Sequence, residues 1–145
     1  MNRDWMRTIE QAEARGETGL WLRWPDGTEA ELAIEPHIRS RLGDAAHFAK
    51  VRAGDWGQSV AWPNGEEIGA DTLWADTLTA TGRDDARQFL AWRLANGFSL
   101  AKAADALGLA RRTVAYYSNG ERRVPKAILL ACKGWDALHG KRKAA

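Results

Sequence analysis

The spacing of apolar residues changes near residue 20. Residues 5–15 place apolar side chains three or four positions apart, which predicts a short amphipathic helix. Residues 20–24 and 30–34 instead alternate between apolar and outward-facing positions, and Pro-Asp-Gly at 25–27 is a typical turn sequence. The pattern therefore predicts a β-hairpin with one buried face and one partly charged face.

A second hairpin is predicted further along. Phe48 and Val51 form one arm, residues 56–62 form the other, and Ala-Gly-Asp at 53–55 is the turn. Residues 36–46, between the hairpins, fit either a short helix or a loop. We expect three to five strands in this half of the chain.

Residues 76–84 hold three threonines and a glycine without apolar periodicity, which predicts a linker with the domain boundary near residue 82. Asp84 or Asp85 is the expected cap of the helix that follows. Further helices begin at a Ser99 cap and at Pro125. The expected fold class is α+β.

Three parts make up this predicted fold. Residues 1–81 form a small antiparallel sheet domain with a short helix, and residues 82–140 form an all-α helix-turn-helix domain of four or five helices. Residues 141–145 form a basic tail.

The register of the helix-turn-helix comes from Gly108, which tolerates the positive φ needed where one helix stops and the next begins. Ala104, four positions earlier, is small enough for a close helix crossing. Val114, six positions later, lies on the inner face of the second helix. These three residues are the predicted scaffold.

The distribution of charged residues also divides the chain, near residue 85. Residues 1–85 carry 9 Lys/Arg and 16 Asp/Glu, a net charge of −7, whereas residues 86–145 carry 12 and 3, a net charge of +9. Such asymmetry favours a polyanion as the partner of the basic half. Attraction between the two halves is the alternative explanation.

Composition excludes several classes of protein. Apolar runs are far shorter than the roughly 20 residues that a membrane helix needs, and the start of the chain lacks the apolar core of a signal peptide. We expect a cytoplasmic protein with no membrane association. The lone Cys132 is expected to be a core thiol.

The second half resembles the Cro/λ-repressor class of helix-turn-helix domains, also called the xenobiotic-response-element class. The resemblance rests on Ala104, Gly108, Val114 and residues 117–125, and it covers about residues 85–138. It implies binding to double-stranded DNA as a homodimer, with residues 110–118 as the recognition helix in the major groove. At the start of that helix Ala110 replaces the usual Ser or Thr cap.

The resemblance and helical geometry together give candidate contacts. Outward positions of the recognition helix are candidates for base contacts: Arg112, Tyr116, Thr113 and Arg111, of which Arg111 is also placed to hold a phosphate. Candidates for phosphate contacts are Lys102, Asn119, Arg122 and Arg123. The alternative is that these arginines only form a solvent-exposed face of the domain.

The first half resembles a small bacterial β-rich family of unknown function over about residues 18–76. The match rests on the hairpin and on Trp-Pro-Asn-Gly at 62–65 with the acidic and aliphatic residues after it. Members of that family occur alone or fused to helix-turn-helix modules, and resemble partners encoded beside candidate toxins. The resemblance implies no activity.

Enzymatic chemistry has little support in the sequence. His37, His47 and His139 are far apart and lack companions at metal-ligand spacing, and there is no nucleophile elbow or phosphate loop. We expect no catalytic residue, no metal and no cofactor. The tryptophans of the first half could line a ligand pocket, but a core role is favoured: Trp21, Trp24, Trp56, Trp62 and Trp74.

Two hypotheses of function stay open. The first is a homodimeric transcriptional repressor whose acidic half senses a ligand or partner. The second is an antitoxin or adaptor whose acidic half binds a protein partner, with DNA binding serving autoregulation. In a third variant the helical half has lost DNA binding and only docks protein.

Overall fold

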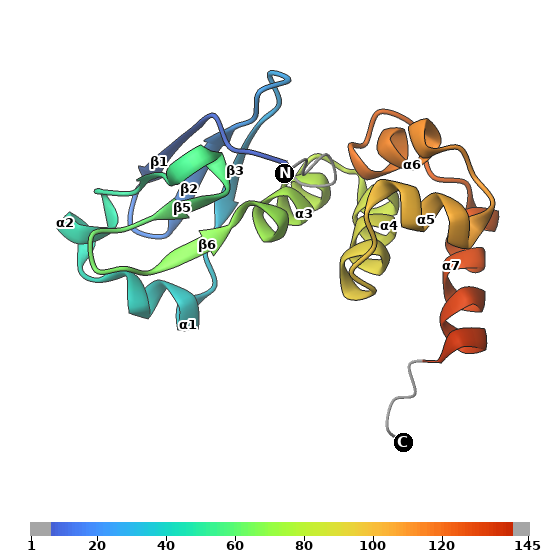
Figure 1. Ribbon diagram of the computed structural model, residues 1–145. Coiled ribbons are helices and arrows are strands. Elements are labelled where there is room, and N and C mark those ends of the chain that lie inside the picture. Colours follow the sequence, from blue (N-terminus) through green and yellow to red (C-terminus); the bar gives the residue numbers. More distant parts are fainter. Residues whose placement is uncertain (1–6, 141–145) are drawn as a thin grey trace. The chain divides into compact units, whose positions relative to one another are not determined.

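The computed structural model describes residues 7–140, and the chain has an α+β fold (Figure 1). It divides into two compact units, one ending at Thr81 and the other beginning at Gly82. Each unit is described on its own. The predicted basic tail, residues 141–145, lies outside the described residues, as do Trp5 and Met6.

The first unit opens with a three-stranded antiparallel sheet in the order β1 (Gln11–Arg15), β2 (Gly19–Arg23) and β3 (Glu29–Ala33). Leu22 pairs with Ala30, and the turn between β2 and β3 is closed by a hydrogen bond from the Gly27 amide to the Trp24 carbonyl. The predicted first hairpin is therefore confirmed.

A second antiparallel sheet follows, in the order β4 (Arg52–Ala53), β5 (Ser59–Ala61) and β6 (Glu67–Gly69). The segment between the sheets forms short helices: α1 (Pro36–Arg39), the 3₁₀ turn η1 (Ser40–Leu42) and α2 (Ala45–Phe48). A second 3₁₀ turn, η2 (Asp55–Gly57), connects β4 with β5. The longest helix of the unit is α3 (Ala70–Ala80).

The core of this unit is aromatic. The rings of Trp24 and Trp74 meet edge to face at 4.9 Å, and Trp24 Nε1 donates a hydrogen bond of 3.2 Å to Thr77 Oγ1. Phe48 stacks on Trp62 with 6.0 Å between ring centroids. Trp24, Trp62 and Trp74 are buried, as expected for a core.

Three predictions for this half are wrong. The described part of the predicted first helix contains strand β1, whose alternating exposure shows the period of a sheet edge. The described residues contain six strands rather than three to five. Phe48, expected in a strand, closes helix α2, and the connection of the second hairpin is longer than residues 53–55.

The predicted linker at residues 76–84 is also wrong over most of its length. Helix α3 continues to Ala80, because Leu73, Trp74 and Leu78 follow helical spacing. Thr77 fits inside the helix because its hydroxyl donates to the Leu73 carbonyl at 2.8 Å. Only Thr81, Gly82 and Arg83 separate α3 from the next helix.

The second unit contains four helices: α4 (Asp84–Ala95), α5 (Leu100–Leu107), α6 (Arg111–Ser118) and α7 (Lys126–His139). Ser99 caps α5 as predicted, and its hydroxyl accepts the Lys102 amide proton at 3.1 Å. Asp84 and Asp85 lie inside the first turn of α4 instead of capping it, and Pro125 precedes the first residue of α7. The buried core of the unit comprises Phe89, Trp92, Leu100, Ala103, Ala104, Val114, Tyr117, Val124 and Cys132.

Candidate functional site

Helices α5 and α6 meet at a tight turn. Gly108 adopts the left-handed conformation, with φ of 71°, and the Leu109 amide donates to the Ala104 carbonyl at 2.9 Å. Ala104 and Val114 are buried in the core between the helices. These are the three residues that the sequence analysis assigned to the scaffold of a helix-turn-helix.

The first turn of α6 is open to solvent. Ala110 precedes the helix and offers no side-chain cap, as the sequence indicated. Arg111 and Arg112 follow it with exposed side chains, and Thr113 is half-buried. The helix thus carries two exposed arginines at an end that has no side-chain cap, an arrangement that favours an anion there.

The outer face of α6 continues into the loop that follows it in the sequence. Arg112, Tyr116 and Asn119 are spaced so that they share one face of the helix. The Arg122 guanidinium lies 4.2 Å from the centre of the Tyr116 ring, within cation-π range. A predicted base-contacting residue and a predicted phosphate-contacting residue are thereby brought together.

The far end of α6 is anchored by a buried arginine. Arg93 of α4 is 1% exposed, and it donates to the Ser118 hydroxyl at 2.6 Å and to the Phe98 carbonyl at 3.1 Å. A buried guanidinium is tolerated only where its protons find acceptors. Arg93 therefore links three segments: α4, the α4–α5 connection and the end of α6.

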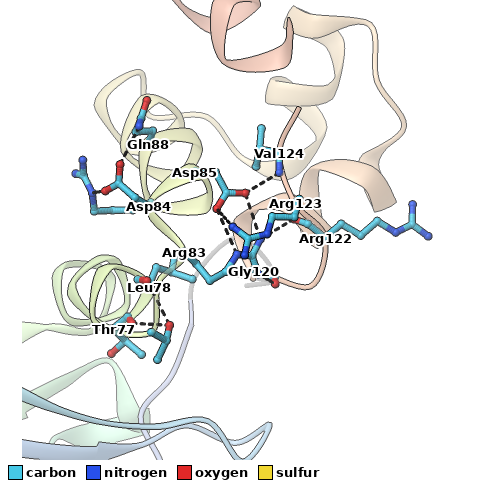
Figure 2. Close-up of polar contacts among 12 residues, drawn as sticks. Thr77, Leu78, Arg83, Asp84, Asp85, Gln88, Gly120, Arg122, Arg123 and Val124 are labelled. Carbon is cyan, nitrogen blue, oxygen red and sulfur yellow. Dashed lines mark hydrogen bonds and ion pairs between the residues drawn. The ribbon is translucent and has the colours of Figure 1, made fainter. Parts of the chain in front are cut away.

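The loop from Gly120 to Val124 is fixed to the start of α4 (Figure 2). Arg83 donates to the carbonyl of Gly120 and, at 2.9 Å, to that of Arg122. Asp85 accepts the Val124 amide proton at 2.7 Å and forms an ion pair of 3.3 Å with Arg83. We call this group, Arg83 and Asp85 with the loop backbone they hold, the loop clasp.

The electrostatics of the loop clasp are favourable to the charged form of Asp85. Burial acts to raise the pKa of this carboxyl group, but hydrogen bonds from Arg83 and from the Val124 and Ala86 amides outweigh it. Together they hold the pKa below its ordinary value. The position in the first turn of α4 also suits a negative charge.

The remaining predicted contact residues are less closely grouped. Arg123 is 76% exposed, and its guanidinium lies 3.6 Å from Asp85. Lys102 lies on a different helix, in the first turn of α5, with an exposed side chain. Residues 82–140 together carry ten Lys/Arg and five Asp/Glu, so the surface around α6 belongs to a basic unit.

Three functional candidates were missed by sequence reasoning. Arg83 and Asp85 act on a loop more than 35 residues away, and no local pattern predicts such a contact. Trp56, which the sequence assigned to a tryptophan core, is 86% exposed. Its φ of 62° is rare for a bulky residue.

Trp56 borders a groove of about 480 Å³ in the first unit. Its polar lining includes Arg52, Asp55 and Glu67, and Ser59 donates a hydrogen bond of 2.7 Å to Glu67. The backbone is pinned there, because the Ile9 amide donates to the Gly57 carbonyl at 2.7 Å. The exposed indole thus lies on a turn that this hydrogen bond ties to Ile9.

The described part of the chain offers little other chemistry. Residues 7–140 contain no cluster of three His, Cys, Asp or Glu side chains able to hold a metal ion. Cys132 is buried, and desolvation together with the charge of Asp136 raises the pKa of its thiol to about 12. None of the helices in this part of the chain is both long and apolar enough to cross a bilayer.

The two units define a class of protein in which an α+β domain precedes a four-helix domain with an exposed basic face. Residues 9–77 match the model of a family described as a protein of unknown function, DUF2442. This match agrees with the family resemblance seen in the sequence and extends it to include β1.

A solved structure resembles the whole chain. It is described as a "Putative DNA Binding Protein" from Nitrosomonas europaea ATCC 19718. It shares 31% identity over 99% of this chain and 95% of that chain, with a TM-score of 0.66. The chain belongs to the same family as this Nitrosomonas protein. A comparison with curated proteins found no match.

Proposed function

We propose that this protein is a sequence-specific, double-stranded DNA-binding regulator of the repressor type, in which α5 and α6 form a Cro-like helix-turn-helix. The observation that carries the proposal is the continuous polar face of Arg112, Tyr116 and Asn119, extended by Arg122 stacked on Tyr116. The description of the related Nitrosomonas protein supports it. No catalytic step or cofactor is part of the proposal.

In this proposal α6 enters the major groove, with its first turn toward the base edges. Arg112 is the residue assigned to a guanine edge, through two parallel hydrogen bonds, and Thr113 and Tyr116 border it. Arg111, Lys102, Asn119, Arg122 and Arg123 are assigned to the DNA backbone. A homodimer would place two such helices about one turn of DNA apart.

Selection of bound fragments from random-sequence duplex DNA tests the specificity. We expect enrichment of an inverted repeat whose half-sites are centred about 10 base pairs apart, as a two-fold symmetric dimer requires. Recovery of DNA without a shared sequence would reject a sequence-specific regulator. Enrichment of a single half-site would reject the homodimer alone.

Arg112→Ala on the selected duplex tests the base contact. The change removes a bidentate contact and should weaken binding by about 1–3 kcal/mol while relaxing the preference at one base pair. Arg87→Ala is the matched control, because it removes one positive charge from α4 outside the α6 face. Equal effects of the two variants would show that Arg112 contributes charge only.

A second function is favoured by one observation in the first unit. Trp56 is highly exposed on a turn pinned to Ile9, beside a groove with acidic residues, within a unit that is acidic overall. Exposed tryptophans are common anchors of protein interfaces. We therefore propose as the alternative an antitoxin or adaptor, in which this unit binds a protein partner and DNA binding serves autoregulation.

Trp56→Ala in the full chain separates the two functions. If the unit binds a partner through this residue, the variant loses a co-purifying protein that wild type and Arg112→Ala both retain. Its DNA affinity should not change. A partner retained equally by all three proteins would contradict the assignment to Trp56.

A further inference from the structure

The loop that follows α6 is held from two sides. The amides of Gly120, Glu121 and Arg122 donate to carbonyls of Tyr117 and Tyr116 at the end of α6. Backbone groups at Gly120, Arg122 and Val124 also bond to two side chains at the start of α4. Three successive points of the loop are therefore fixed from outside, and Figure 2 shows Arg83 and Asp85 between the loop and the helix.

We propose that Arg83 and Asp85 are positioning residues for DNA binding, which hold Arg122 and Arg123 in place for contact with the DNA backbone. The inference rests on the proposed function and goes beyond it. Neither residue belongs to the recognition helix or to the set of DNA contacts assigned from the sequence.

The first argument concerns entropy. Ordering one backbone residue costs about 1–2 kcal/mol, and a loop that is free before binding would lose this on contact with DNA. The hydrogen bonds of the loop clasp are already present in the protein without DNA. The cost of ordering the loop is therefore met during folding and not on binding. The arginine side chains are thus presented from a fixed backbone.

The second argument concerns direction. The Arg122 carbonyl is held by Arg83, while its guanidinium lies over the Tyr116 ring on the outer face of α6. The next residue, Arg123, is held near Asp85. Fixing the backbone between these two residues sets where both positive charges stand relative to α6.

The third argument concerns charge. Asp85 places a negative charge 3.6 Å from Arg123, which by electrostatics alone opposes an approaching phosphate. Removing that charge should therefore strengthen DNA binding if Asp85 has no other role. A positioning role predicts the opposite sign, so the two explanations can be separated.

The test uses the full chain and a 25-base-pair duplex of mixed sequence, with affinity measured by fluorescence anisotropy between 50 and 300 mM NaCl. Arg83→Lys keeps the charge but loses the planar fork that serves two carbonyls. Asp85→Asn raises the net charge by one. Asp84→Asn is the matched control, because it makes the same charge change but contacts only Arg87 and Gln88 within α4.

We expect Arg83→Lys and Asp85→Asn each to lower affinity at 100 mM NaCl by about three- to tenfold. The slope of log affinity against log salt should become shallower by about 0.9 for each phosphate that the variant no longer neutralises. Asp84→Asn should bind as tightly as wild type or slightly more tightly. Circular dichroism at the binding temperature checks that every variant is folded. Among folded variants, a merely structural role of Arg83 and Asp85 would leave the salt slope unchanged.

Two results would overturn the proposal. One is an unchanged slope in Arg83→Lys, and the other is tighter binding by Asp85→Asn that matches Asp84→Asn. Wild type that binds no DNA under these conditions refutes the proposed function itself. Wild type that binds with variants that keep its slope refutes the positioning role alone.

Discussion

The two ends of α6 are held in different ways. At its start, the turn from Gly108 to Ala110 is stabilised by residues close in sequence, through the left-handed glycine and the Leu109–Ala104 hydrogen bond. At its end, backbone hydrogen bonds to Tyr116 and Tyr117 are supplemented by the side chains of Arg93, Arg83 and Asp85, which hold Ser118 and the following loop from segments 25 to 39 residues away.

This difference separates two sources of order. The start of the helix depends on backbone conformation and apolar packing, which are sequence-local and insensitive to charge. The end depends on guanidinium and carboxylate groups, whose hydrogen bonds need defined partners, and the carboxylate of Asp85 also responds to pH. The two ends of α6 are therefore sensitive to different kinds of mutation.

The largest expected effect on stability is at the end of α6 that contains Ser118. Arg93→Met removes the donor to the buried Ser118 hydroxyl and to the partly buried Phe98 carbonyl, and a buried group that loses its partner costs about 1–3 kcal/mol. We expect a loss of about 3 kcal/mol, measured by native-state hydrogen exchange at the buried Val114 amide. Arg87→Met, which breaks an exposed ion pair, should cost less than about 1 kcal/mol. Equal costs would contradict the role given to Arg93.

The next effect is at the turn. Gly108→Ala should destabilise by about 1–2 kcal/mol, because a side chain disfavours the left-handed conformation. Gly134→Ala should stabilise by about 0.5–1 kcal/mol, because it lies inside α7. An added methyl group meets no atom within 4 Å at either site, so the opposite signs would come from backbone conformation. Two changes of the same sign in thermal unfolding would refute that explanation.

A substitution at the uncapped start of α6 is expected to stabilise the protein, by an amount similar to or smaller than the effects at the two glycines. Ala110→Ser supplies an oxygen that can accept a free amide proton, and should stabilise the helix by about 1 kcal/mol. Ala110→Val adds bulk without an acceptor and serves as the control. If serine and valine have the same effect on exchange at Val114, capping is not what this site lacks.

The smallest effect is the pH dependence of the loop clasp. The pKa of Asp85 is lowered in the folded protein, so its contribution is present above the ordinary carboxyl value near 3.8 and is lost as pH falls through the folded value. The stability difference between wild type and Asp85→Asn should be less than about 1 kcal/mol and should shrink between about pH 5 and pH 3. A difference that grows as pH falls would mean that the carboxylate destabilises the loop.

The sequence predicted the parts of the fold that depend on neighbouring residues. The first hairpin, the Ser99 cap and the left-handed Gly108 each follow from local spacing and turn chemistry. Strand β1 was missed because its inward positions hold only alanines, which are half-buried and give a weak pattern. The end of α3 was missed because a buried threonine resembles a linker residue until its partners Leu73 and Trp24 are known.

The candidate site divides in the same manner. Helical spacing placed Arg112 and Tyr116 on the outward face of α6, but it could not show that Arg122 stacks on Tyr116. The loop clasp could not be predicted because it joins residues 37 and 39 positions apart. Arg93 was missed as well, although an arginine among apolar positions is a local pattern that could have indicated a long-range polar contact.

The most direct test of the account is the affinity of the unmodified full chain for duplex DNA as a function of salt. Four charged backbone contacts per protomer, by Arg111, Lys102, Arg122 and Arg123, predict that log affinity falls with log salt with a slope of about −3.6 for each protomer bound. Binding at 50 mM NaCl with a slope near that value would support the DNA-binding role of α6 and its loop. No binding at 50 mM NaCl, or an affinity that stays flat up to 300 mM, would contradict it.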